Sequence, residues 1–190
     1  MRILQHNERK QKLIELGIPK ELATNLEDIE SHWMILNPDE SYDILKSIHK
    51  SNEVLKNYNL VPIYERMDDV YQFVIIYAFN SEEKRIIHYE FNGHAEDRGY
   101  NNNFQLLLLE ELIEYYFFVK DFIEEERDEE LSKHELLKEE KNDFLCLAEL
   151  LGFVNSNKML NLLQVTNHIE SISYNSLKDL LSISLGIYKA

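Results

Sequence analysis

The chain has 190 residues and carries 35 acidic against 20 basic side chains, which gives a formal net charge of -15. This length suits one domain, or one domain with an appendage, and can bury a core without a disulfide or a metal ion. The negative charge disfavours nucleic acid and anionic membranes as partners, because their phosphate groups repel such a surface. A single cysteine, Cys146, rules out an intrachain disulfide, and the N-terminus is too polar for a signal peptide. We therefore expect a cytoplasmic protein.

Helices are predicted before the first strand, over residues 7–16, 19–33 and 40–57. The first ends at Gly17, a residue type that readily adopts the left-handed conformation found after helices. The second begins at Pro19, which is favoured at a first helical position. In the third, apolar periodicity turns Leu45 and Leu55 inward.

The most strongly patterned stretch, residues 60–91, predicts a β-hairpin or meander. Residues 70–79 are apolar at both parities and rich in β-branched and aromatic residues, which is typical of a strand covered on both faces. A polar turn follows, and residues 85–91 then alternate, which predicts a half-buried strand. Residues 60–64 contain Pro62 and predict an edge strand.

Residues 92–103 predict a loop, and residues 104–125 predict a long helix. Its apolar stripe faces away from a row of glutamates, so we expect it to close one face of the sheet. Charges recur every few residues, which excludes a membrane span.

The region after residue 126 shows helical patterns and no strand pattern. Residues 135–151 place Cys146 on their apolar side, residues 158–169 form a further helix, and a capping box at 176–179 opens the last one. The predicted fold class is α+β, with a small antiparallel or mixed sheet at about residues 60–92 flanked by helices. We expect two parts, an α+β domain over 1–125 and a helical extension over 126–190 packed on it.

The charge is unevenly distributed along the chain. Residues 110–140 hold 13 acidic and 4 basic side chains, a local balance of -9. One interpretation is a solvated helix face that keeps the protein soluble. The other is a docking surface for a basic protein, whose association such a field would accelerate.

One enzyme hypothesis is a metal-dependent hydrolase built on His88, Glu90 and His94. These side chains can bind zinc, and the His-x-Glu spacing is similar to that of zinc deaminases, but the Pro-Cys-x-x-Cys partner motif is absent. The alternative is a strand end whose polar face meets solvent. We expect no metal site and no cofactor.

Two further patterns suggest nucleases. Asp68 and Asp69 with the run 82–84 are similar to an Asp…Glu-x-Lys metal site, but that run falls in the predicted turn. Arg127 and His134 lie at a spacing similar to the Arg…His motif of HEPN ribonucleases. They are surrounded by glutamates that would repel RNA. We expect no catalytic residue, and the HEPN-like ribonuclease stays an alternative.

Five stretches in chain order resemble the SUKH superfamily of bacterial immunity proteins. They are Ile18-Pro19-Lys20-Glu21-Leu22, Leu60-Val61-Pro62-Ile63, Asp69-Val70-Tyr71-Gln72-Phe73, residues 85–91, and the helix start from Phe104 to Tyr116. The resemblance implies an α+β fold and a cytoplasmic protein that occludes a cognate toxin, often a nuclease, without catalysis. It implies a protein partner, and the charge of the chain argues against nucleic acid and membrane.

We place the expected partner-binding surface on the acidic segment after the long helix, together with a tyrosine from the preceding loop. Its residues are Glu124, Glu125, Glu126, Asp128, Glu129, Glu130 and Tyr100. A third hypothesis is an adaptor whose leucine-striped C-terminal helices form homo-oligomers.

Overall fold

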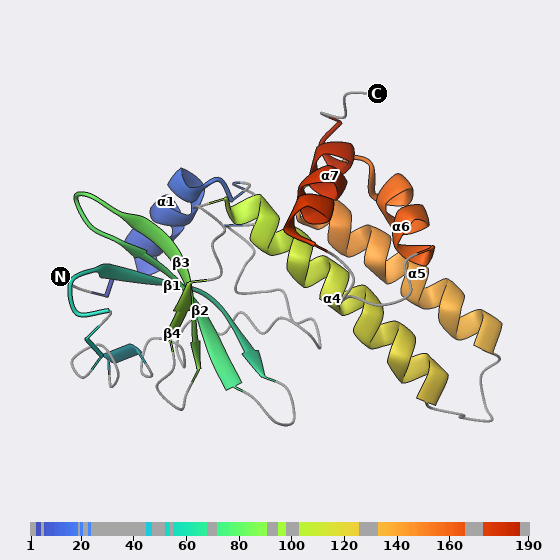
Figure 1. Ribbon diagram of the computed structural model, residues 1–190, viewed down its shortest axis with the longest axis horizontal. Helices are drawn as coiled ribbons and strands as arrows, with labels where there is room; N and C mark the ends of the chain where they lie inside the picture. The colour runs from blue at the N-terminus through green and yellow to red at the C-terminus, as the bar shows by residue number, and fades with distance from the viewer. Residues whose placement is uncertain are drawn as a thin grey trace. The chain divides into compact units, whose positions relative to one another are not determined.

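The computed structural model describes residues 3–4, 6–18, 20, 23, 45–46, 52–53, 55–67, 72–90, 95–97, 103–125, 133–165 and 173–186. In chain order the elements are α1 (His6–Leu16), β1 (Asn59–Met67), β2 (Gln72–Phe79), β3 (Lys84–Glu90), β4 (Ala95–Asp97), α4 (Phe104–Glu125), α5 (Lys133–Leu150), α6 (Ser156–Gln164) and α7 (Tyr174–Ser184) (Figure 1). The fold is therefore α+β, as the sequence predicts. Within the described residues after 125, every regular element is a helix.

The chain divides into two compact units, residues 1–104 and 105–190. The first, the sheet unit, holds α1 and the four strands, and the second, the helical unit, holds α4 to α7. The boundary predicted from the sequence lies after residue 125, whereas the division between the compact units lies at the start of α4. The packing of α4 on the sheet stays a prediction.

The sheet is an antiparallel meander with strand order β1-β2-β3-β4. In β2 the side chains of residues 74–78 are all buried, which confirms a strand covered on both faces. The prediction for β3 was wrong in one respect. Its residues 86–89 are buried at both parities, each no more than 4% exposed, so its centre is not half-buried. The alternating pattern led to a wrong prediction because His88 is a polar residue that is buried in the structure.

The loop predicted over residues 92–103 contains a short strand. Ala95 to Asp97 form β4, which pairs with Ile87 to Tyr89 of β3 and places Glu96 opposite His88 in register. Three residues are too few for an alternating pattern to emerge, so the sequence gives no signal for this strand.

The turn between β2 and β3 is confirmed as a polar hairpin turn. The Asn80 N–H donates to the Glu83 carbonyl at 2.9 Å, and Asn80 Oδ1 accepts from the backbone N–H groups of Glu82 and Glu83 at 2.8 Å each. The Asn80 side chain, at the first position of the turn, thus accepts hydrogen bonds from backbone N–H groups that have no partner strand in the turn.

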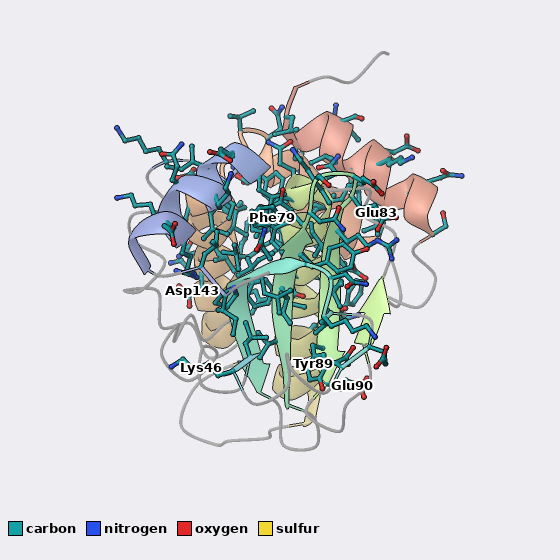
Figure 2. All side chains as sticks on the ribbon, turned by 90° about the vertical axis from the view of Figure 1, so that its left-hand side faces the viewer. Lys46, Phe79, Glu83, Tyr89, Glu90 and Asp143 are labelled. Atoms are coloured by element: carbon teal, nitrogen blue, oxygen red, sulfur yellow. The ribbon has the colours of Figure 1, made fainter. Side chains whose placement is uncertain are left out.

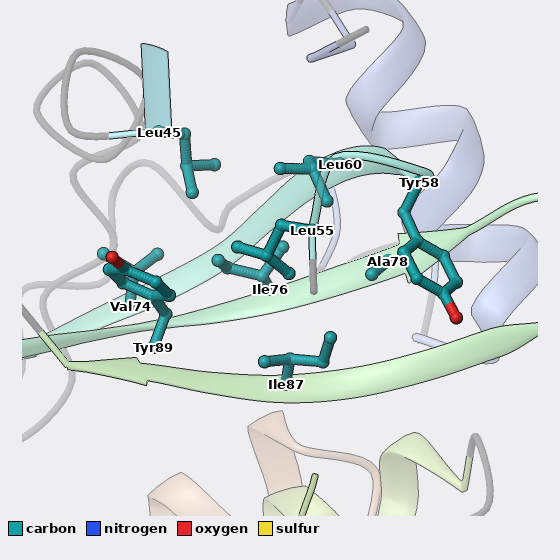
Figure 3. Close-up of a cluster of buried hydrophobic side chains, with 9 residues drawn as sticks. All are labelled: Leu45, Leu55, Tyr58, Leu60, Val74, Ile76, Ala78, Ile87 and Tyr89. Carbon is teal, nitrogen blue, oxygen red and sulfur yellow. The ribbon is translucent and has the colours of Figure 1, made fainter. Parts of the chain in front are cut away.

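One face of the sheet carries a core cluster of nine buried side chains. They are Leu45, Leu55, Tyr58, Leu60, Val74, Ile76, Ala78, Ile87 and Tyr89 (Figure 3). The strand members share this face because paired residues of neighbouring strands do, for example Val74 with Tyr89 and Ile76 with Ile87. Full burial of each large apolar side chain is worth roughly 1.5–3 kcal/mol relative to exposure.

Leu45 and Leu55 point inward as predicted, but the helix expected over residues 40–57 does not reach its expected end. Residues 55–57 form a turn, in which Asn52 Oδ1 accepts from the Leu55 N–H at 3.2 Å and the Asn52 carbonyl accepts from the Lys56 N–H at 3.1 Å. An asparagine side chain competes with helical hydrogen bonding in this way.

β1 is an edge strand, as its proline predicts, and it contains a bulge. Pro62 pairs with Ile76 and Tyr64 with Ile75, so Ile63 is the extra residue. The Arg9 guanidinium donates to the carbonyl of Pro62 at 2.8 Å and to that of Ile63 at 2.6 Å. Adjacent carbonyls of a regular strand point to opposite sides, and the bulge brings both to one edge.

Two contacts from the N-terminal segment thus cover the outer edge of β1. The Leu4 N–H donates to the Leu60 carbonyl at 3.0 Å, within a parallel bridge between Ile3 and Leu60. Arg9 covers the next two carbonyls and is itself only 4% exposed. At Pro62 this edge presents a carbonyl but no N–H. Arginine suits such an edge because its side chain has hydrogen-bond donors and no acceptor. Covered edges resist pairing with other chains.

α1 ends as predicted at Gly17, which has a φ of 106°. The Gly17 N–H donates to the Ile14 carbonyl and the Ile18 N–H to the Leu13 carbonyl, which is the Schellman pattern. Leu13 and Ile18 are both buried, so the apolar contact that accompanies this motif is formed. α5 ends in the same manner at Gly152, whose φ is 88°.

In the helical unit, α4 has the predicted bounds but not the predicted one-sided pattern. The four leucines 106–109 are each no more than 2% exposed, and Glu111 is 1% exposed. Leu106 to Leu109 point in different directions around the helix axis, so this turn is covered on all sides, while Glu110 and Glu114 are half-buried. Tyr116 lies edge-on to Phe144 of α5, with ring centroids 5.8 Å apart.

Cys146 is exposed, so its predicted place on the apolar side of its helix was wrong. From residue 141 to the end of this helix, the buried positions are Phe144, Ala148 and Leu151, at the spacing i, i+4, i+7. Cys146 is two residues from the first of them and therefore falls on another face.

The last two helices differ from the prediction in their ends. α6 ends at Gln164 instead of 169. α7 begins earlier than expected, because its N-cap is Ser173, whose side chain accepts from the Ser176 N–H at 3.3 Å. The capping box predicted at Ser176 was therefore displaced by one helical turn. Asn155 joins the two helices by donating from its backbone N–H to the Ser184 carbonyl at 3.0 Å and from Nδ2 to the Ile183 carbonyl at 2.7 Å.

Candidate functional site

The expected partner-binding surface lies at the end of α4 and in the segment that follows it. Glu124 and Glu125 are the last two residues of α4. The remaining residues proposed for this surface lie outside the described part of the chain: Glu126, Asp128, Glu129, Glu130 and Tyr100. The structure therefore describes only the first two residues of the acidic segment, which lie in α4.

The last described turn of α4 contains Glu124 and Glu125 and no basic residue. In the sequence this turn leads directly into the acidic run Glu126, Asp128, Glu129 and Glu130.

The two units differ in how their charge is spread. Residues 1–104 carry 18 acidic and 12 basic side chains, and residues 105–190 carry 17 and 8. Within the helical unit the whole excess lies between residues 110 and 140, because residues 141–190 hold four acidic and four basic side chains. The negative charge is concentrated on the part of the chain that contains α4 and the start of α5.

The candidate metal cluster is only partly described. His88 lies at the centre of β3 and is 4% exposed, which contradicts the expectation that this polar strand face meets solvent. Glu90 is half-buried at the end of the same strand, opposite the hairpin turn that contains Glu83 (Figure 2). His94 lies outside the described residues. Among the residues that are described, no three His, Cys, Asp or Glu side chains are arranged to hold a metal ion.

The described residues of the two nuclease-like patterns also do not form a site. Glu82 to Lys84 are exposed in the hairpin turn and at the start of β3, as expected for a solvated turn, and Asp68 and Asp69 lie outside the described residues. Of the HEPN-like pair, His134 belongs to the first turn of α5 and Arg127 is outside the described residues.

A polar cluster at the hairpin end of the sheet is not among the sites predicted from the sequence. The Tyr58 hydroxyl donates to Glu83, and Arg85 donates to the same carboxylate at 2.8 Å while lying over the Tyr58 ring, 5.7 Å from its centroid. The hydrogen bond from Tyr58, followed by that from Arg85, lowers the pKa of Glu83. Glu83 and Arg85 lie 25 and 27 positions after Tyr58 along the chain, so only the fold brings them to it.

Nearby, Lys12 of α1 pairs with Glu15 at 2.5 Å and lies over the Phe79 ring, 5.3 Å from its centroid. The hydrogen bond from Lys12 lowers the pKa of Glu15. Burial, with a smaller contribution from Glu15, raises the pKa of Tyr77. These contacts join α1 to the end of β2 and use charges of both signs, so they serve the internal structure of the sheet unit.

Comparison with protein-family models, with curated proteins and with solved structures gives no match. Within the described part of the chain, no helix has both the length and the apolar character needed to cross a bilayer.

Proposed function

We propose that this chain is a cytoplasmic immunity-type protein that binds and neutralises a cognate, basic, nuclease-like protein toxin without catalysis. The observation that carries the proposal is the placement of charge: residues 110–140, which include Glu124 and Glu125 of α4, have a balance of -9. Such a concentration of like charge within one stretch favours a role in binding a partner of opposite charge.

The chemistry of the partner follows from this field. Nucleases that bind phosphate backbones are basic around their nucleic-acid site, so an acidic protein surface can occupy that site in place of the phosphates. The resemblance to SUKH immunity proteins supports the same class of partner, and the α+β fold is compatible with it.

The test is binding to the protein encoded by the gene directly beside this one, where the resemblance implies that a toxin gene lies. The test variant is the triple charge reversal Glu125→Lys, Glu126→Lys and Glu129→Lys. The matched control is Asp143→Lys, Glu149→Lys and Asp179→Lys, which changes the net charge equally at exposed positions outside the segment. Affinity is measured by calorimetry, with circular dichroism to verify that both variants are folded.

We expect the test variant to bind at least about tenfold more weakly than the wild type, and the control to lose much less. Inhibition of the toxin should saturate at a stoichiometric ratio, because the protein occludes a site and turns nothing over. Equal losses in the two variants would remove the 124–130 segment as the interface. No binding by the wild type, or inhibition by substoichiometric amounts, would overturn the proposal.

A further inference from the structure

We draw no further inference here: the strongest candidate, the exposed apolar side chains of Leu150, Val154, Leu162 and Val165 at the α5–α6 connection and the end of α6, is a surface patch for which nothing in the structure shows what covers it.

Discussion

The sheet unit and the helical unit use charged residues in different ways. In the sheet unit, described charges lie in internal contacts: Arg9 covers two edge carbonyls, and Glu83 accepts from Tyr58 and Arg85. In the helical unit, the acidic excess gathers between residues 110 and 140 and includes the last turn of α4. The excess of 13 acidic over 4 basic side chains in residues 110–140 is the feature for which we propose a basic partner.

The units also differ in the range of the contacts that hold them. Arg9 and the carbonyls it binds are 53 and 54 positions apart, whereas the helical unit has contacts of shorter range, such as the 28 positions between Asn155 and Ile183 and the three between Ser173 and Ser176. Contacts over long sequence separations cost more chain entropy to form. The sheet unit therefore depends on a few distant contacts, and the helical unit on apolar helix faces.

The largest effect is expected from the helical core. Phe144→Ala removes a ring that is 1% exposed and lies against Tyr116, so we expect a loss of about 3–5 kcal/mol in the free energy of unfolding. Denaturant unfolding measures it. Cys146→Ala is the control on the same helix at an exposed position, and we expect a change within about 0.5 kcal/mol. Similar losses in both variants would contradict the helix orientation.

The sheet unit should be most sensitive at Arg9. Arg9→Gln shortens the side chain and withdraws the guanidinium from the carbonyls of Pro62 and Ile63, so we expect a loss of about 2–4 kcal/mol in stability. Lys10→Gln also removes a positive charge, but from an exposed position of the same helix, and should change stability by at most about 0.5 kcal/mol. If the two variants unfold alike, the edge contact does not stabilise the sheet.

Replacing the glycine after a helix by alanine should lower the free energy of unfolding by a smaller amount, and by the same amount in both units. Gly17 and Gly186 have φ values of 106° and 73°, and an added Cβ meets nothing within 4 Å at Gly17 and only Asn155 Nδ2 at 3.5 Å at Gly186. With no clash at either site, alanine should cost about 1–2 kcal/mol through backbone conformation alone. Denaturant unfolding of Gly17→Ala and Gly186→Ala checks this, and asparagine should cost less at each. A loss at only one site would show that the units differ in their helix ends as well.

The smallest effect concerns pH. Since the pKa of Glu83 is lowered in the folded state, its stabilising contribution is present above the unfolded pKa of about 4.3 and is lost as the pH falls through the folded pKa. Tyr58→Phe removes the hydrogen bond that lowers this pKa most, so the Glu83 carboxyl should titrate at higher pH in the variant. NMR titration of the Glu83 carboxyl carbon measures the difference. Identical titration curves would show that the hydroxyl does not bind this carboxylate.

Much of the fold could be predicted because local chemistry dictates it. Gly17 and Gly152 end their helices, the apolar run through Ile76 forms the covered strand, and Pro62 marks the edge strand. The errors arise where burial or a single side-chain contact decides the structure in place of the apolar pattern. His88 is polar but buried, residues 55–57 form a turn beside Asn52 where apolar spacing predicts helix, and Ser173 caps α7 ahead of an equally acceptable Ser176.

Of the candidate site, only the acidic charge and its position along the chain could be predicted from the sequence. Counting side chains locates the acidic stretch, and the helix pattern places Glu124 and Glu125 at the end of α4. The cluster of Tyr58, Glu83 and Arg85 has no sequence signal, because its members meet only when the hairpin folds back beside the segment before β1. A partner also cannot be named from charge alone, since a negative field attracts any basic surface.

The most direct measurement is the salt dependence of binding between this chain and the product of the neighbouring gene, from about 0.05 M to about 0.5 M NaCl, a range over which the Debye length shortens severalfold. If acidic residues after α4 meet a basic partner, the affinity of the wild type should fall steeply with salt. The slope for Glu125→Lys, Glu126→Lys and Glu129→Lys should then be clearly shallower. A complex whose affinity is indifferent to salt, or equal slopes for the two proteins, would contradict the account.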